Sequence, residues 1–113
     1  DYNTVVRKKD RKRMEIPGSN LEIELISASR NRQIEMIEAK LGVGEETKRE
    51  KNTYEGEECI LVKSGELKIE IGKEKYNLKE GDSIYFLFSL PHKITNIGDK
   101  QLEFISAITP PNI

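Results

Sequence analysis

The sequence alternates apolar and polar residues along short segments, and this pattern predicts β-strands almost throughout. Residues 21–25 alternate leucine or isoleucine with glutamate, and residues 67–71 repeat the pattern with lysine and glutamate. A period of two places one set of side chains in a core and the other in water. Turn signals separate the segments by roughly 8–12 residues, and no segment keeps a helical period. The pattern therefore predicts an all-β sandwich or barrel.

Two stretches depart from simple alternation. Residues 33–41 alternate, but their phase changes between Met36 and Ile37, which predicts a β-bulge at that point. Residues 42–51 are polar and are predicted to form a loop.

The remaining apolar and aromatic residues indicate what fills the core. Cys59 is the single cysteine; it lies in an apolar strand pattern, and we expect it to be buried. The aromatic residues of the later strands are expected mainly in the core, where one of them can form a pocket wall: Tyr85, Phe86, Phe88 and Phe104.

Composition limits the classes of protein that remain. A chain of 113 residues supports one domain, and a net charge of −1 gives the domain as a whole no nucleic-acid footprint. Six basic residues nevertheless fall within residues 7–13, either as a charged edge strand or as the end of a linker near DNA phosphates. One cysteine permits no intrachain disulfide and favours a reducing cytoplasm, and no apolar run is long enough to span a membrane.

The residues able to do chemistry lie in two segments punctuated by glycine. In the first, six residues separate Glu58 from Gly65; the second has Gly81-Asp82 followed by Pro91, His92 and Asn96. This layout resembles the two motifs of the cupins. The resemblance implies a cupin fold, which is a single-domain double-stranded β-helix or jelly-roll barrel.

A narrower resemblance comes from residues 56–67 and 76–86, together with Leu90-Pro91-His92. These segments are similar to the cupin sensor domains that follow a helix-turn-helix in bacterial XRE-family regulators. The resemblance implies an effector-binding and dimerising domain whose DNA-binding part lies outside this chain. Because the chain starts at Asp1 rather than Met, we expect it to be cut from a longer protein. Residues 1–20 would be an N-terminal basic segment and edge strand, and residues 21–113 the barrel.

The candidate site departs from the cupin pattern. The resemblance puts the two motif histidines at Asn52 and Tyr54, so only Glu58 and His92 remain as good metal ligands. A divalent transition metal wants about three such ligands. We therefore expect no tight cofactor, with a degenerate site for Zn, Mn, Fe or Ni at Glu58 and His92 as the alternative. The expected ligand-binding residues are Asn52, Tyr54, Glu58, His92, Phe86 and Phe104.

Each of these groups also has a plainer interpretation. Glu58 either sits in water at a strand end or is buried with a partner such as His92, Tyr54 or a ligand. His92 either lines the barrel pocket or is hydrogen-bonded near a turn. Asp82, which follows Gly81, is predicted to be a turn residue.

The function that this sequence favours is small-molecule sensing in a DNA-binding regulator, without catalysis. Catalysis is not expected because the sequence lacks a nucleophile–histidine pattern, a phosphate-binding loop and a cysteine cluster. The alternative is a stand-alone small cupin, either a binding protein or a metal-dependent enzyme such as a dioxygenase or isomerase. We expect a homodimer that pairs through residues 11–16 or 21–26, with no membrane partner.

Overall fold

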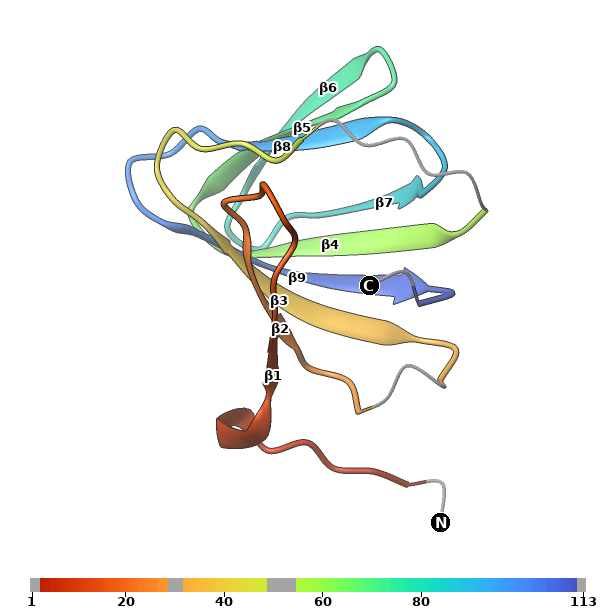
Figure 1. Cartoon of the computed structure of the whole chain (residues 1–113). Helices are drawn as coiled ribbons and strands as arrows, with labels where there is room; N and C mark the ends of the chain where they lie inside the picture. The colour runs from red at the N-terminus through yellow and green to blue at the C-terminus, as the bar shows by residue number, and fades with distance from the viewer. Residues whose placement is uncertain (1–2, 29–31, 49–54, 112–113) are drawn as a thin grey trace.

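The computed structural model describes residues 3–28, 32–48 and 55–111, whose regular secondary structure is almost entirely β-strand (Figure 1). A single turn of 3-10 helix, η1 (Lys8–Asp10), precedes the first strand. Within the described residues, no helix is both long enough and apolar enough to cross a membrane. The strands in chain order are β1 (Lys12–Met14), β2 (Glu22–Leu25), β3 (Glu35–Leu41), β4 (Glu57–Ser64), β5 (Glu66–Ile71), β6 (Glu74–Lys79), β7 (Ser83–Leu87), β8 (His92–Asn96) and β9 (Leu102–Thr109).

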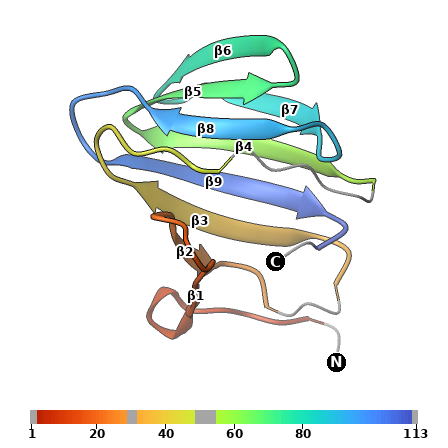
Figure 2. The same cartoon turned by 45° about the horizontal axis from the view of Figure 1, so that its top comes forward.

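The strands form two antiparallel sheets that enclose one core. The larger sheet has the order β1-β2-β3-β9-β4-β7 and the smaller sheet the order β6-β5-β8 (Figures 1 and 2). Residues 45–47 add a short stretch beside β8, because Thr47 N donates to Ile94 O at 2.8 Å and Asn96 N to Glu45 O at 2.9 Å. From β3 onward the chain passes back and forth between the sheets, as in a jelly roll. The predicted fold class is confirmed.

The core follows the period of two in the sequence. Along β4, Glu58, Ile60 and Val62 are buried while the residues between them are exposed. Leu102 and Phe104 alternate in the same way along β9. Both sheets contribute to one cluster of buried apolar side chains. The alternation therefore decides which residues can reach the interior, where the candidate site lies.

Two core predictions were wrong for the same reason. Because Glu58 faces inward, Cys59 faces outward and is exposed rather than buried. Because Phe86 faces inward, its neighbour Tyr85 is 57% exposed. A run of apolar residues indicates a hydrophobic strand, but adjacent side chains of a strand point to opposite faces of the sheet. An apolar residue in such a run can therefore face outward. Phe86, Phe88 and Phe104 are buried, as predicted.

The β-bulge predicted between Met36 and Ile37 was also wrong. Strand β3 pairs with β9 without interruption from Glu35 opposite Ile108 to Leu41 opposite Leu102. Glu35, only 2% exposed, faces inward in the same phase as Ile37, so the alternation does not change phase at Met36. The register shift falls instead in β4, between Val62 and Ser64.

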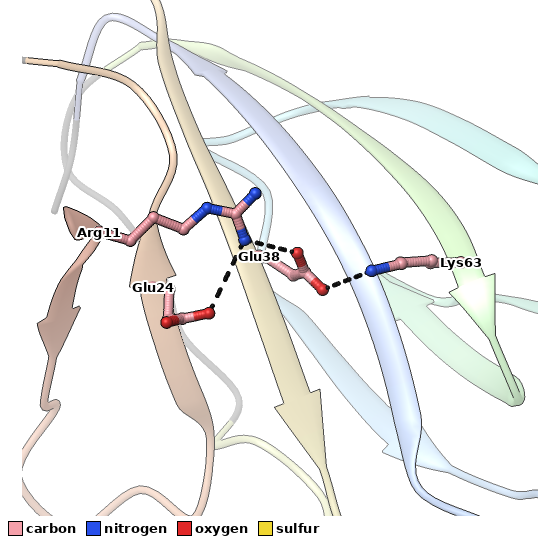
Figure 3. A network of polar contacts seen from close by, with 4 residues as sticks. All are labelled: Arg11, Glu24, Glu38 and Lys63. Carbon is pink, nitrogen blue, oxygen red and sulfur yellow. Dashed lines mark hydrogen bonds and ion pairs between the residues drawn. The ribbon is translucent and has the colours of Figure 1, made fainter. Parts of the chain in front are cut away.

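A polar cluster lies on the outer side of β3, away from the core (Figure 3). Glu38 accepts hydrogen bonds from Arg11 Nη1 at 2.9 Å and from Lys63 Nζ at 3.0 Å. Arg11 Nη1 also lies 3.8 Å from Glu24 Oε1. The Glu38 side chain is only 7% exposed, so these contacts hold the segment before β1 against β3. Burial alone would raise the pKa of Glu38, but Lys63 and Arg11 together hold that pKa below its ordinary value of 4.5.

This cluster predicts an acid-sensitive contribution to stability. Because the pKa of Glu38 is lowered in the folded state, its contribution is fully present above pH 4.5 and is lost as the pH falls through the lowered value. Glu38→Gln should cost roughly 1–2 kcal/mol at pH 7 and should flatten the loss of stability between about pH 5 and pH 3. Urea unfolding at pH 7 measures the cost of the substitution. Urea unfolding at several pH values between about 5 and 3 measures the change in pH dependence. Glu24→Gln is the matched control, because Glu24 is 36% exposed and should matter little. An unchanged pH profile in Glu38→Gln would count against this role.

Candidate functional site

A cavity of about 460 Å³ lies between the two sheets at one mouth of the barrel. Its polar lining comes from four parts of the chain: the β1–β2 loop, the segment beside β8, strand β4 and strand β8. Most of the remaining wall is apolar, as in typical small-molecule sites. The polar lining residues are Ser19, Thr47, Lys48, Glu58 and His92. The apolar lining residues are Ile16, Pro17, Leu21, Ile23, Ile37, Phe88, Ile94, Phe104 and Ile108.

The β1–β2 loop forms one wall of this cavity. It is held as a tight turn, because Ser19 N donates to Ile16 O at 3.0 Å and Leu21 N donates to Ser19 Oγ at 3.1 Å. Gly18 has φ +77, and a Cβ at this position would lie 2.7 Å from Lys48 Nζ. Glycine therefore suits the positive φ of this turn, and the flexible end of the Lys48 side chain lies beside it.

Glu58 supplies a buried carboxylate to the lining of the cavity. It is 7% exposed and lies on β4 between Phe86 of β7 and Ile108 of β9. Ser106 Oγ donates a hydrogen bond to Glu58 Oε2 at 2.5 Å. The interpretation that Glu58 sits in water at a strand end was wrong. Burial of the acid is offset by the hydroxyl donor, which the sequence analysis did not identify as its partner.

His92 supplies an imidazole from the first position of β8. Its Nδ1 lies 3.0 Å from Leu90 O, and its ring centroid lies 5.0 Å from that of Phe86 and 5.7 Å from that of Phe88. In the tautomer that makes this bond, Nδ1 donates to the carbonyl, and Nε2 is left to accept a hydrogen bond or to coordinate. The two aromatic rings and the carbonyl fix the ring orientation. His92 therefore has both predicted features, a place in the pocket wall and a hydrogen bond near a turn.

The structure brings together some of the predicted site residues. Glu58, His92 and Phe104 line the same cavity. Phe86 packs against His92 but lines a separate groove of about 940 Å³ between the edges of β6 and β7. Asn52 and Tyr54 lie outside the described residues.

Sequence reasoning missed three polar lining residues, Ser19, Thr47 and Lys48. They belong to polar stretches without motif spacing, and only the fold brings them to the barrel mouth. Asp82, by contrast, has the predicted turn role, because Lys79 N donates to its Oδ2 at 2.8 Å.

The described part of the chain does not assemble a full metal-ligand set. It contains no group of three or more His, Cys, Asp or Glu side chains placed to hold a metal ion. Glu58 and His92 would give two ligands, and Glu58 already accepts the hydrogen bond of Ser106. Two ligands fall short of the three that a typical catalytic site for zinc uses. The described residues alone therefore do not make up a site for a divalent metal ion. A metal site that includes Glu58 and His92 remains a prediction.

The fold is that of a small jelly-roll barrel with a cavity at its mouth. The model of the Cupin domain family matches residues 37–108, which is more than half of the chain. The chain therefore belongs to the cupin family. Over 76 residues it is 36% identical to an uncharacterized protein of Methanocaldococcus jannaschii. That alignment covers 67% of this chain and 60% of the relative, so the chain spans about 60% of the length of the curated relative it matches.

Solved structures agree on the fold. The structure of KdgF from Halomonas sp. matches with a TM-score of 0.80 at 12% identity, covering 97% of this chain and 96% of that one. The Cupin_2 domain of an XRE family transcriptional regulator from Enterobacter cloacae matches with a TM-score of 0.73 at 20% identity, covering 81% and 98%. An HTH_3 family transcriptional regulator from Vibrio cholerae gives 0.69 at 19% identity, covering 82% of this chain and 52% of that protein. At these identities the likeness establishes the fold alone.

Proposed function

We propose that this domain binds a small-molecule effector in the barrel-mouth cavity and serves as the sensing and dimerising part of a DNA-binding transcriptional regulator. The observation that carries the proposal is the cavity itself, an apolar pocket with a few fixed polar groups. Glu58 is held by Ser106, and His92 is held by Leu90 and two aromatic rings. Recognition needs a shaped, preorganised pocket of this kind and does not need a metal.

The lining suggests the chemistry of the effector. Apolar side chains make up most of the wall, so the ligand should have an apolar body. The carboxylate of Glu58 would accept a hydrogen bond from a hydroxyl or amine of the ligand. Lys48 would favour a negative or strongly polar group at the loop side. The proposed effector is therefore a small amphipathic molecule with a donor group at one end.

The regulator part of the proposal is supported by similarity to other proteins. One structurally similar protein is the Cupin_2 domain of an XRE family transcriptional regulator. Another is an HTH_3 family transcriptional regulator. The basic residues 7–13 would lie next to the DNA-binding part. Such a regulator would work in the cytoplasm. Effector binding would change DNA binding only if the effector binds one arrangement of the dimer better than the other.

The source gene tests this part directly. An in-frame helix-turn-helix encoded within about 65–80 codons upstream of Asp1 would support the proposal, since such a domain is small. A start codon at or just before Asp1 would reject it and leave a stand-alone cupin. The longer protein should then bind its own promoter DNA in a gel-shift assay with a steep dependence on salt.

The cavity predicts a binding result that needs no known effector. The fluorescent probe 8-anilinonaphthalene-1-sulfonate, which has an apolar body and an anionic group, should bind with about one site per chain. Ser19→Trp should fill the mouth and weaken binding at least roughly tenfold, which is about 1.4 kcal/mol. Asn20→Trp, in the same loop, is the matched control because Asn20 does not line the cavity. Fluorescence titration compares them. Equal affinities for the two variants would place the probe elsewhere.

A stand-alone metal-dependent cupin enzyme is the second candidate, favoured by the presence of Glu58 and His92 in one cavity. An acid and an imidazole can share general acid–base work. Calorimetric titration with Zn, Mn, Ni or Fe discriminates the two candidates. Micromolar binding that His92→Ala abolishes would favour the enzyme.

A further inference from the structure

The outer face of the larger sheet carries apolar side chains that the core does not use. On β4 and β7, Leu61 is 43% exposed, Tyr85 57% and Leu87 51%. Met36 of β3 is 36% exposed, and Cys59 of β4 is exposed as well. A single exposed leucine needs no explanation, but a contiguous group of them on a monomer does.

The strand register makes these residues contiguous. Met36 of β3 pairs with Ala107 of β9, which pairs with Cys59 of β4, which in turn pairs with Tyr85 of β7. One step along the strands, Leu61 of β4 adjoins Ile105 of β9. Outward-facing residues therefore form an apolar surface across four neighbouring strands. We call it the outer apolar face, and it consists of Met36, Cys59, Leu61, Tyr85, Leu87, Ile105 and Ala107.

The N-terminal segment covers a different part of the sheet. Arg11 reaches only as far as Glu38 of β3, and Lys63 binds the other carboxylate oxygen of Glu38 (Figure 3). Figures 1 and 2 both show the segment beside β1 and β2, on the side away from β4 and β7. The ion pair between Lys63 and Glu38 crosses β9 beside Ile105, so the charged cluster borders the outer apolar face at that corner.

The outward residues of β4 have a symmetric order. Taken from the other end of the strand, the two apolar residues keep their central places, and the acid and the base change places. Its outward residues in order are Glu57, Cys59, Leu61 and Lys63, that is, an acid, two apolar residues and a base. Tyr85 Oη donates to Glu57 Oε1 at 2.5 Å, which holds the carboxylate at the rim of the face. Lys63 is 48% exposed at the other end. A two-fold axis passing near Ile60 would set Glu57 against the partner's Lys63 and Cys59 against the partner's Leu61.

We propose that the outer apolar face is the interface of a two-fold homodimer, with a second copy of this chain as its occupant. A two-fold contact uses the same patch on both subunits, so the patch has to complement itself. The row from Glu57 to Lys63 meets that requirement in charge and in apolarity. Two such sheets would pack face to face about 10 Å apart. The surface lies on the opposite side of the sheet from the cavity, so the inference stands apart from the proposed effector.

This location differs from the pairing predicted from the sequence. Residues 11–16 and 21–26 belong to β1, β2 and their flanks, and β1 is the end strand of the larger sheet. Pairing there would add strands edge to edge. The two arrangements respond to different substitutions, so one set of variants separates them.

The first test is the mass of the 113-residue chain in solution. Light scattering at about 50 μM should give twice 13.0 kDa. Leu61→Glu should raise the dimer dissociation constant at least roughly 100-fold, because a buried unpaired charge is costly at an interface. Ile97→Glu is the matched control, since Ile97 is 41% exposed but lies in the β8–β9 turn. A 13 kDa mass for the unchanged chain would overturn the proposal. So would a dimer that resists Leu61→Glu, which would indicate edge pairing.

The second test uses the charges. Glu57→Lys alone should weaken the dimer about tenfold, because it sets like charges against each other. An equimolar mixture of Glu57→Lys and Lys63→Glu should form mixed dimers, because each new charge then meets its opposite. Lys63 also holds Glu38, so a thermal melt must first show that Lys63→Glu is folded. If it is not, alkylation of Cys59 provides the second measurement. The unchanged chain should react several-fold slower than Leu61→Glu, and equal rates would overturn the proposal.

Discussion

Replacing Asn96 with alanine is expected to lower the free energy of unfolding by about 3 kcal/mol. Asn96 is 2% exposed and ties together three separate backbone groups. Its Nδ2 donates to Leu41 O at 2.9 Å and to Lys100 O at 3.0 Å, while its Oδ1 accepts from Gly98 N at 2.9 Å. Alanine would leave these groups without the amide in a place that water reaches poorly. Urea unfolding, fitted with an unchanged m-value, measures the loss.

The matched control for this substitution is Asn77→Ala. Asn77 is an exposed asparagine of β6, so its loss should change stability by less than about 0.5 kcal/mol. A loss below about 1 kcal/mol in Asn96→Ala would mean that water or a shifted turn replaces the amide. The expected difference assigns the asparagine of the second cupin-like segment to the scaffold. It would hold the β8–β9 turn against the end of β3 and would not contact a ligand.

The fold was predictable because its main determinant is local. Alternation along residues 21–25 and 67–71 is a period of two that only a strand satisfies. The glycines at the turns also act locally, as at Gly65 and Gly81, whose φ values are +93 and +88. Each of these features constrains a few neighbouring residues, and each can be recognised without knowledge of the rest of the chain.

The site was less predictable because it depends on which strands become neighbours. Glu58 could be recognised as a buried acid that needs a partner, but Ser106 is 48 residues away and meets it only through the pairing of β4 with β9. Ser19 and Lys48 reach the cavity because the β1–β2 loop and the segment beside β8 both lie at the mouth of the barrel. Alternation predicts which face of a sheet a residue lies on. Which residues meet in a site also depends on the order of the strands in the sheet, and local sequence patterns do not give that order.

The wrong burial predictions have the same origin at a smaller scale. Cys59 and Tyr85 were judged by the apolar character of their segments and not by the phase of the alternation. Their outward position is also what makes the outer apolar face visible as a candidate interface. Apolar residues on the wrong phase of a strand are therefore informative, because they mark surface that folding of one chain leaves exposed.

Replacing Phe104 with alanine is expected to cost about 4 kcal/mol of unfolding free energy, the largest effect among the substitutions considered. Phe104 is 2% exposed, and its neighbours across the strands are Ala39 on β3 and Val62 on β4. Neither neighbour is large enough to fill the volume of a phenyl ring. Because Phe104 lines the barrel-mouth cavity, the lost volume should add to that cavity instead of collapsing. Urea unfolding measures the stability.

The enlarged cavity provides a second readout that a general loss of stability would not give. An apolar hollow of this kind takes up small aromatic molecules, so saturating benzene should raise the melting temperature of Phe104→Ala more than that of the unchanged protein. Ile105→Ala is the control on the same strand. Ile105 faces outward and is only half-buried, so its loss should cost no more than about 1.5 kcal/mol and should create no benzene response. A smaller loss of unfolding free energy in Phe104→Ala than in Ile105→Ala would contradict this prediction. It would mean that the residues around Phe104 move to fill the space and that the cavity wall is not rigid.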